Sequence, residues 1–388
     1  MQLFNPIKTL FTYLYVLLYT PWLITHLIFD ITRYIIPSAR PSPRWSLHQA
    51  VRMRVVRLLL YHWSLTESGD RLNLGQGKEK NRFEVVSPGN PKLYIGICLN
   101  STVQPAQLGL TWTPSRPPPP GLIRTDVIVA LHFHGGAFVI GNGRDADTGL
   151  LSQSLIRNTG CTHVCTPQYR LSSSRNGHFP APLQDGITAY LSLIKTKCIP
   201  ADQIILSGDS AGANLALGLL RYIHEHGEAL NIPFPKAVML WSPWVDVGAA
   251  FEQDMRLSPN YQTDYLNKEF GLWGAKTISA YGAVDPTGPY LSPLRHPFSL
   301  KTDLPVFVHA GGSEVLCDDI RDFCKRYREH GWQVYLDVSE GCPHDILLLG
   351  SRIGFGDEAA KAADQARVCL SKATGLSLRS YDSRRALW

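Results

Sequence analysis

The sequence lacks several patterns that would assign it to other classes of protein. Its eight cysteines, scattered over 388 residues, form no Cys-x-x-Cys pair, which argues against a zinc ribbon or a thioredoxin-type site. A chain of this length can bury a large core without a disulfide scaffold. Acidic residues are absent between Ile31 and Thr66, a stretch that holds six arginines. Because the net charge is +6, the rest of the chain is close to neutral, which argues against a nucleic-acid-binding surface.

A long uncharged segment lies near the N-terminus. Residues Leu10–Phe29 contain no charged side chain over twenty positions. As a helix this segment would rise roughly 30 Å, enough to cross the hydrocarbon core of a bilayer. No A-x-A cleavage site follows it, which argues against a secretory signal peptide. We therefore predict a membrane anchor over residues 1–36 that spans the bilayer or lies in one leaflet. An apolar helix buried in the domain is the alternative.

The orientation of this anchor stays open. Six arginines follow the apolar segment, and positive charge favours the cytosolic side of a membrane. The tripeptide Asn100-Ser101-Thr102, by contrast, is a glycosylation sequon that is usable only in the lumen.

The remainder of the chain alternates between strand and helix patterns. Apolar positions recur at helical spacing over Arg44–Leu65 with arginines on the other face, which predicts an amphipathic helix. Lys92–Leu99 alternates as a strand does, and the proline-rich Thr113–Gly121 is typical of a surface loop. Further strands are expected at 126–133, 162–167, 203–207, 237–241, 306–310 and 333–338. Helices are expected at 149–158, 183–195, 211–224, 318–330 and 356–370. This order predicts an α/β fold with a mostly parallel central sheet and helices on both faces.

Gly208-Asp209-Ser210-Ala211-Gly212 fits the G-x-S-x-G pattern between an expected strand and an expected helix. Flanking glycines permit the strained turn that lifts a serine hydroxyl out of a sheet, so we predict that Ser210 is a nucleophile. The helix that begins at Ala211 directs its free N–H groups toward the oxygen of a tetrahedral intermediate.

His134-Gly135-Gly136-Ala137-Phe138 follows an earlier strand. Its glycines allow close approach of the backbone to a substrate, so the N–H groups of Gly135, Gly136 and Ala211 are the predicted oxyanion hole. His132 and His134 lie on one strand face, but no third ligand of the HxHxDH kind follows, so we predict neither a metal nor a cofactor. His134 is instead expected to brace the loop by hydrogen bonding.

A serine hydroxyl needs a base to take its proton, and the base needs a carboxylate to fix its tautomer. His344, on a loop after an expected strand, is the best placed histidine beyond Ser210. Glu314 follows the strand at 306–310 and is the predicted acid. Asp318 and Asp319, one helical turn further on, are its rivals, although acids there fit a helix N-terminus.

Several motifs together resemble those of the hormone-sensitive-lipase-like family of α/β-hydrolases, which includes arylacetamide deacetylases and steryl acetyl hydrolases. They are HGGAF at 134–138, Tyr169-Arg170-Leu171, FPAPLQD at 179–185, GDSAG at 208–212, WSPWVD at 241–246, the Pro289–Leu294 segment, the Glu314 turn and His344. The resemblance implies a Ser210–His344–Glu314 triad. It also implies a cap, formed by the region 37–80 and an insertion at 243–297, over a hydrolase domain at 81–375, with a tail at 376–388. The N-terminus resembles that of relatives anchored in the endoplasmic reticulum membrane.

The sequence departs from the family pattern at three places. Ala137 stands where many relatives have glycine, and Glu314 where aspartate is commoner. Ser172-Ser173-Ser174 replaces the Ala-Pro-Glu that often follows Tyr-Arg-Leu, so the support of the site is expected to differ.

We expect a carboxylic ester hydrolase that acts on short-chain or acetyl esters of small hydrophobic substrates at a membrane, in lipid or specialised metabolism. An acyltransferase or amidase that uses the same triad is the alternative. A non-catalytic ligand-binding protein on the same fold is disfavoured, because it predicts a lost triad member and all three are present.

Overall fold

A computed structural model describes residues 6–70, 72–122, 125–300, 302–376 and 378, with the backbone alone at 6–13 and 16. The predicted tail falls almost wholly outside these residues. Eight strands of the described chain form one sheet in the order β1-β2-β4-β3-β5-β6-β7-β8. They are β1 (Phe83–Val86), β2 (Leu108–Thr113), β3 (Val129–Phe133), β4 (His163–Gln168), β5 (Ile204–Asp209), β6 (Ala237–Trp241), β7 (Pro305–Gly311) and β8 (Gln333–Ser339). From β4 to β8 all neighbours are parallel, whereas β1 and β2 are antiparallel.

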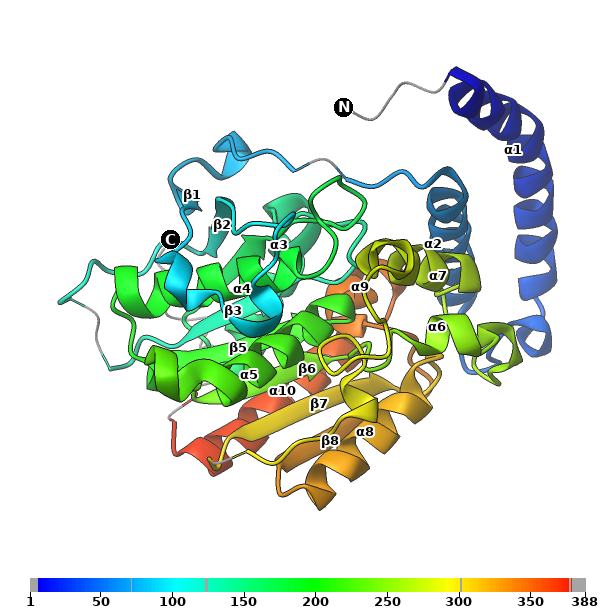
Figure 1. The fold of residues 1–388 in the computed structure, drawn as a ribbon. Coiled ribbons are helices and arrows are strands. Elements are labelled where there is room, and N and C mark those ends of the chain that lie inside the picture. The colour runs from blue at the N-terminus through cyan, green and yellow to red at the C-terminus, as the bar shows by residue number, and fades with distance from the viewer. Residues whose placement is uncertain (1–5, 71, 123–124, 301, 377, 379–388) are drawn as a thin grey trace.

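Helices cover both faces of the sheet (Figure 1). The helices are α1 (Pro6–Tyr34), α2 (Leu47–Thr66), α3 (Asp145–Thr159), α4 (Ala181–Leu191), α5 (Ala211–Leu230), α6 (Ala249–Glu252), α7 (Lys268–Ile278), α8 (Cys317–Glu329), α9 (Ile346–Ile353) and α10 (Gly356–Thr374). α4, α5 and α8 lie on one face, and α3 and α10 lie on the other and pack against each other. The predicted α/β fold with a mostly parallel sheet is therefore confirmed.

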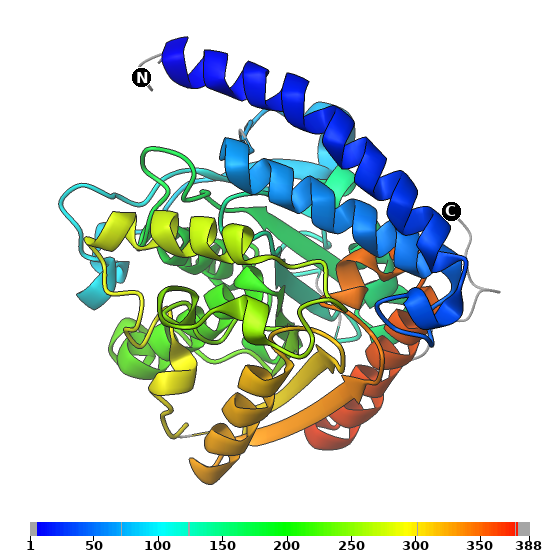
Figure 2. The same ribbon diagram turned by 90° about the vertical axis from the view of Figure 1, so that its right-hand side faces the viewer.

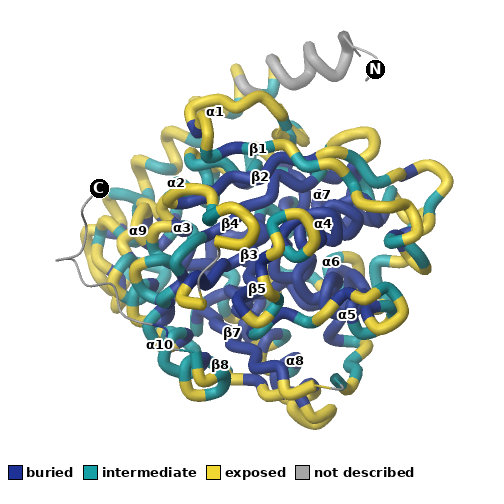
Figure 3. Tube along the Cα trace, turned by 90° about the vertical axis from the view of Figure 1, so that its left-hand side faces the viewer, coloured by how far each residue is buried: buried dark blue, intermediate teal, exposed yellow. Residues whose placement is uncertain are grey.

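The central strands are buried along their whole length (Figure 3). Every residue of β3, β5, β6 and β7 is buried, because helices cover both faces of these strands. β5 and β7 extend to Asp209 and Gly311, beyond the predicted ends of the two strands. The carboxyl ends of these parallel strands lie at one edge of the sheet, where ligand sites occur in open α/β folds.

The prediction of a strand at Lys92–Leu99 is wrong. The segment forms two short 3₁₀ turns, and Gly96 has a φ of +56°, which a strand does not accommodate. Tyr222 from α5 satisfies its backbone, since its hydroxyl donates to the Leu93 carbonyl (2.7 Å) and accepts from the Ile95 N–H (3.0 Å). The antiparallel strands β1 and β2 are not among the strands predicted from the sequence.

The predicted amphipathic helix is α2, which begins with a capping box: Ser46 and Gln49 each bind the other's backbone N–H. The apolar N-terminal segment is α1, which lies alongside α2 (Figure 2). Asp30 on α1 pairs with Arg54 on α2 (2.6 Å). Among the described residues, no helix combines the length and the hydropathy needed to cross a membrane, so the predicted spanning segment is not supported.

Candidate active site

Ser210 lies in a tight turn between β5 and α5. Its backbone has φ 51° and ψ −117°, a conformation that non-glycine residues adopt only at a cost. The Ser210 N–H donates to the carbonyl of Trp241 on the neighbouring strand (2.9 Å). Gly212 is required because a Cβ there would lie 2.0 Å from the carbonyl oxygen of Phe133. The structure therefore places Ser210 where the sequence predicts it, at a strained junction of strand and helix.

Glu314 and His344 lie on the loops that follow β7 and β8. The His344 Nδ1 is 2.9 Å from the Glu314 Oε2, and both side chains are buried. Because the carboxylate occupies Nδ1, Nε2 is the ring nitrogen left to accept a proton. Asp318 and Asp319 instead lie in the first turn of α8, as expected of acids at a helix N-terminus.

The electrostatic surroundings of His344 favour its charged form. Burial alone would lower the pKa of His344, but the hydrogen bond and negative charge of Glu314, with the charge of Asp264, raise it to about 9. Burial also raises the pKa of Glu314, against the opposing effect of His344. The pair is thus arranged to hold a proton on the imidazole while the carboxylate stays ionised.

Gly135 lies directly after β3, beside the Ser210 turn. Its N–H donates to the Asp209 Oδ2 (2.8 Å), so it is not free for a substrate oxygen. The prediction that Gly135 contributes to the oxyanion hole is therefore wrong. The glycine pattern carries no sign of this bond, because the Asp209 carboxylate reaches Gly135 only through the pairing of β3 with β5.

The chain then turns sharply through positive φ values at Gly136 (101°) and Ala137 (51°). Ala137 lines the cavity in front of Ser210. Only glycine adopts this backbone region without steric cost, so Ala137 holds it under strain. Ala137, which shares this cavity with Ser210, Gly136 before it and Ala211 after the serine are therefore the candidates for the oxyanion hole.

This loop is braced from both sides. The His134 Nδ1–H donates to the Gly135 carbonyl (2.8 Å), as predicted for a bracing role, and the ring stacks on Tyr169 at 4.3 Å. The hydroxyls of Ser172 and Ser173 donate to the carbonyls of residues 138 and 139 (both 3.0 Å). Two of the three serines at 172–174 thus hold the loop of residues 134–139, the oxyanion loop.

A small cavity of about 30 Å³ opens onto Ser210. Its lining is mostly apolar and comes from both sides of the site: Ala137, Ser210, Trp244, Met255, Leu266, Asn267, Phe270, Gly271 and Leu316. Six of these residues belong to the insertion at 243–297. The insertion therefore covers the serine and limits the space in front of it.

The insertion also holds the loop of Glu314. Asp264 accepts a hydrogen bond from the Val315 N–H (2.8 Å) through Oδ2. Asn260 donates to the Glu314 carbonyl (2.9 Å), and Thr263 donates to the Ser313 carbonyl (3.0 Å). These polar residues belong to no motif, so the sequence alone gives no sign of their role.

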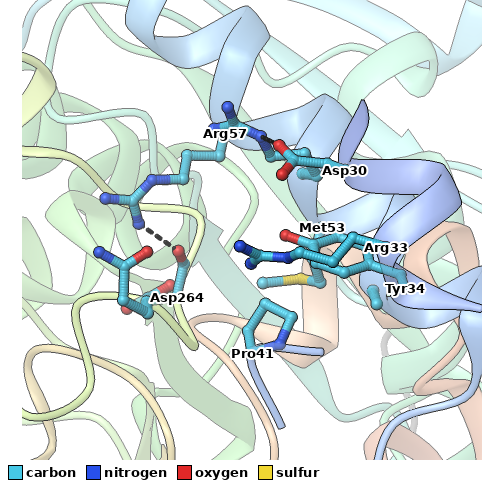
Figure 4. A pocket seen from close by; sticks show the side chains of 10 residues that line it. Asp30, Arg33, Tyr34, Pro41, Met53, Arg57 and Asp264 are labelled. Carbon is cyan, nitrogen blue, oxygen red and sulfur yellow. Dashed lines mark hydrogen bonds and ion pairs between the residues drawn. The ribbon is translucent and has the colours of Figure 1, made fainter. Parts of the chain in front are cut away.

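Arg57 connects this part of the insertion to α2. Figure 4 shows its side chain extending toward Asp264, whose carbonyl it binds at 2.6 Å, and it also donates to the Tyr261 carbonyl (2.5 Å). Arg57 and Asp264 border a cavity of about 160 Å³, which Asp30 and Arg33 of α1 also line. α2 and the insertion are thus joined by a charged side chain as well as by the packing of α2 against α7.

The sequence of this chain matches a family of known proteins over the region that carries the site. Residues 130–348 match a family described as having the alpha/beta hydrolase fold. The chain belongs to this family. The matched region contains the Ser210 turn, the Glu314 loop and the His344 loop.

Relatives of this hydrolase carry the names of esterases. An acetyl-hydrolase of Streptomyces hygroscopicus is 30% identical over 239 residues, which cover 61% of this chain and 68% of the relative. An esterase of Acinetobacter venetianus is 29% identical over 223 residues, which cover 57% and 68%. The predicted enzyme class, a carboxylic ester hydrolase of the α/β-hydrolases, is confirmed.

Solved structures of esterases share the fold. A bacterial esterase of the hormone-sensitive lipase family superposes with a TM-score of 0.57 at 23% identity and covers 84% of this hydrolase and 99% of that chain. The lipase homologue EstE7 from a metagenome library superposes with a TM-score of 0.58 at 20% identity, over 83% and 97%.

Proposed function

We propose that this hydrolase cleaves short-chain esters, above all acetyl esters, of hydrophobic alcohols through an acyl-enzyme on Ser210. The observation that carries the proposal is the cavity of about 30 Å³ in front of Ser210. A site for one water molecule needs roughly 10–15 Å³ by the same measure. The cavity therefore has room for a methyl or ethyl group but not for a long acyl chain.

In the proposed reaction His344 takes the hydroxyl proton of Ser210 while the serine oxygen attacks the ester carbonyl. Glu314 fixes the imidazole through Nδ1 (2.9 Å) and stabilises the imidazolium. The N–H groups of Gly136, Ala137 and Ala211 bind the developing oxyanion. His344 then returns the proton to the leaving alcohol, and a water molecule releases the acid by the reverse sequence.

Turnover of p-nitrophenyl acetate, butyrate and decanoate by the wild type and by Ser210→Ala tests this proposal. We expect kcat/KM to fall from acetate to butyrate and further to decanoate, and Ser210→Ala to lower kcat by at least about 10⁴-fold. Labelling by a fluorophosphonate probe should disappear in the same variant. Ser351→Ala, on the exposed surface of α9, is the matched control and should keep the activity and the labelling. A faster reaction with decanoate, or labelling that persists in Ser210→Ala, would refute the proposal.

We also propose that α1 binds the surface of a lipid bilayer and that this holds the hydrolase at the endoplasmic reticulum membrane. α1 turns tyrosines toward the protein and large apolar side chains toward solvent. Tyr15 and Tyr19 contact rings of α2, and leucine, isoleucine and phenylalanine side chains face outward. The most exposed on α1 and just after it are Leu17, Leu18, Ile24, Ile28, Phe29, Ile35 and Ile36, each with more than half of its side chain exposed. An apolar face of this extent on a soluble protein marks an interaction surface.

Three polar side chains of α1 already have partners within the protein. The hydroxyls of Thr25 and Thr32 donate to backbone carbonyls within the helix (2.9 and 2.8 Å), and Asp30 is neutralised by Arg54. Burying these groups against lipid therefore leaves few hydrogen bonds unmade. The exposed Arg33 at the end of α1 adds a charge that attracts anionic headgroups.

Flotation with vesicles of phosphatidylcholine and phosphatidylserine tests the lipid contact. The triple variant Leu17→Ser, Leu18→Ser, Ile28→Ser should lose at least about tenfold in vesicle binding, since each burial contributes roughly 1.5–3 kcal/mol. Three equally exposed leucines away from α1 provide the matched control: Leu99→Ser, Leu122→Ser, Leu257→Ser. Equal loss in both triple variants, or no flotation of the wild type, would refute the contact. Cell fractionation of both variants checks the location.

A further inference from the structure

Two buried carboxyl groups outside the proposed triad lie beside the catalytic loops. Asp209 precedes Ser210 and is 0% exposed, and Asp345 follows His344 and is 2% exposed. The two carboxyl groups lie beside each other and interact. Two buried carboxylates this close to each other cannot both be ionised without a large cost in repulsion and desolvation, so one of the two acids carries a proton.

The other partners of Asp209 indicate that it is the ionised member. Its Oδ2 accepts from the Gly135 N–H, and its Oδ1 lies 2.8 Å from the His132 Nε2. Burial lowers the pKa of His132 to about 3, so this imidazole is neutral and has a single N–H.

The position of that imidazole proton follows from the next residues in the network. The Trp241 indole N–H donates to the Ser207 Oγ (3.2 Å), and the Ser207 hydroxyl is 2.9 Å from the His132 Nδ1. An indole can only donate, so the Ser207 oxygen accepts from it. Among the contacts of Ser207 in the described residues, His132 Nδ1 is the remaining group able to accept the hydroxyl proton, so Ser207 donates to Nδ1. The imidazole proton is then on Nε2 and points to Asp209.

Asp345 has a different set of contacts. It is the N-cap of α9, and its Oδ1 accepts from the Leu348 N–H at a long 3.2 Å. Its own N–H donates to the Ser242 Oγ (2.9 Å). Apart from its contact with Asp345, the Asp209 carboxylate accepts two short hydrogen bonds, from His132 and Gly135. The Asp345 carboxyl accepts a long hydrogen bond from Leu348. The shared proton belongs with the acid that is less stabilised as an anion.

We propose that Asp345 is a neutral carboxylic acid that donates to the Asp209 carboxylate, and that this acid–carboxylate pair positions the catalytic loops. Through Asp209 the pair holds Gly135 and hence the oxyanion loop. Through Asp345 it joins the Ser210 turn to the loop of His344. Neither acid contacts the ester, so both are positioning residues.

The charges around Asp345 come from several elements. They are Asp209 at the end of β5, His132 on β3, His344 on its own loop and Tyr265 in the insertion. Burial and the negative charge of Asp209 raise the pKa of Asp345 well above its usual range, which outweighs the opposing effect of His344. A carboxyl of this kind takes up a proton when the chain folds at neutral pH.

This proton uptake gives a test that does not require turnover. The contribution of Asp345 to stability is present below its unfolded pKa of about 3.9 and is lost as the pH rises toward its folded pKa. Asp345→Asn keeps a donor toward Asp209 without needing a proton, and asparagine tolerates the left-handed backbone of residue 345 (φ 48°). The melting temperature of Asp345→Asn relative to wild type should therefore rise steadily between pH 5 and 8.

Asp209→Asn is the reciprocal variant. Its amide NH₂ would face either the Gly135 N–H or the His132 Nε2–H, so a donor would meet a donor. We expect kcat to fall at least about tenfold with little change in KM, whereas Asp345→Asn should lower kcat no more than about threefold. Infrared difference spectra of wild type against Asp345→Asn should show the C=O band of a protonated carboxyl.

A larger loss of kcat in Asp345→Asn than in Asp209→Asn would overturn the assignment. So would a difference in melting temperature that does not change with pH, or the absence of a protonated-carboxyl band. The positioning role rests on the proposed triad, but the stability and infrared measurements do not. If Ser210→Ala retained activity while the band and the pH trend were present, the triad would fail and the protonated pair would stand.

Discussion

Asp264 accepts a hydrogen bond from the backbone N–H of Val315 at 2.8 Å, so an insertion residue holds the turn that carries Glu314. The carboxylate is 2% exposed, and its charge also acts on His344. The cap of this hydrolase therefore supports the acid and the base of the site in addition to covering the serine.

Replacing Asp264 by Ala should lower kcat about tenfold and destabilise the fold by about 1.5–3 kcal/mol, the range for a hydrogen bond to a charged group. The pH at which kcat/KM is half-maximal should also fall, because one negative charge near His344 is lost. Asp254→Asn, which removes a surface ion pair with Arg256 on the same insertion, is the control and should change neither quantity. Equal effects of the two variants in pH-rate profiles and urea unfolding would contradict the role of Asp264.

The pH dependence of the reaction follows from His344. Only the neutral imidazole accepts the serine proton, so kcat/KM should rise with pH and be half-maximal near the raised pKa of His344, about 9. Glu314→Gln should lower kcat and move the midpoint down toward the ordinary histidine value of about 6.5. Rates are measured with p-nitrophenyl acetate after subtraction of a Ser210→Ala blank. A midpoint that stays in place in Glu314→Gln would contradict this account.

The raised pKa of His344 also makes the stability of the fold decrease as the pH rises. The folded-state pKa of His344 lies above its unfolded value, so its contribution is fully present below about pH 6.5 and is lost as the pH rises through about 9. Glu314→Gln removes the partner that raises the pKa. Urea unfolding between pH 6 and 10 should therefore show a smaller loss of stability in Glu314→Gln than in the wild type.

Gly274 on α7 lies against the oxyanion loop. A Cβ at this position would lie 2.5 Å from the carbonyl oxygen of Ala137, so Gly274→Ala must displace the loop. We expect kcat to fall about tenfold or more while KM changes little, since complete loss of one oxyanion-hole donor costs roughly 2.7–4 kcal/mol of transition-state stabilisation and a displaced donor costs part of it. Gly149→Ala on α3, where the new methyl group meets its nearest atom at 3.5 Å, is the matched control. Full activity of Gly274→Ala would show that the loop adapts.

Phe270 limits the acyl cavity from the side of α7 and is 5% exposed. Phe270→Leu should enlarge the cavity and raise the ratio of butyrate to acetate turnover several-fold. A buried Phe→Ala change typically costs about 3–5 kcal/mol of stability, and Phe270→Leu should cost roughly half of that. If Phe270→Leu left the ratio of butyrate to acetate turnover unchanged, the acyl group would have to bind outside this cavity.

The sequence by itself determined the α/β fold and the positions of Ser210, Glu314 and His344. Apolar strands that are buried on both faces and helices of regular period are local patterns, and a serine at a strand–helix junction needs only its neighbours to be recognised. The 3₁₀ segment at Lys92–Leu99 was predicted wrongly because the hydroxyl of Tyr222, distant in the chain, satisfies its backbone.

Only the tertiary structure decided that the Gly135 N–H is engaged, what the insertion supports and that two buried acids lie beside each other. Gly135 is engaged by Asp209, Val315 by Asp264, and Asp345 meets Asp209 across two loops. Each of these contacts joins residues that lie far apart in the chain. Burial then sets their energy, because a polar group withdrawn from water depends on the partner that the fold supplies.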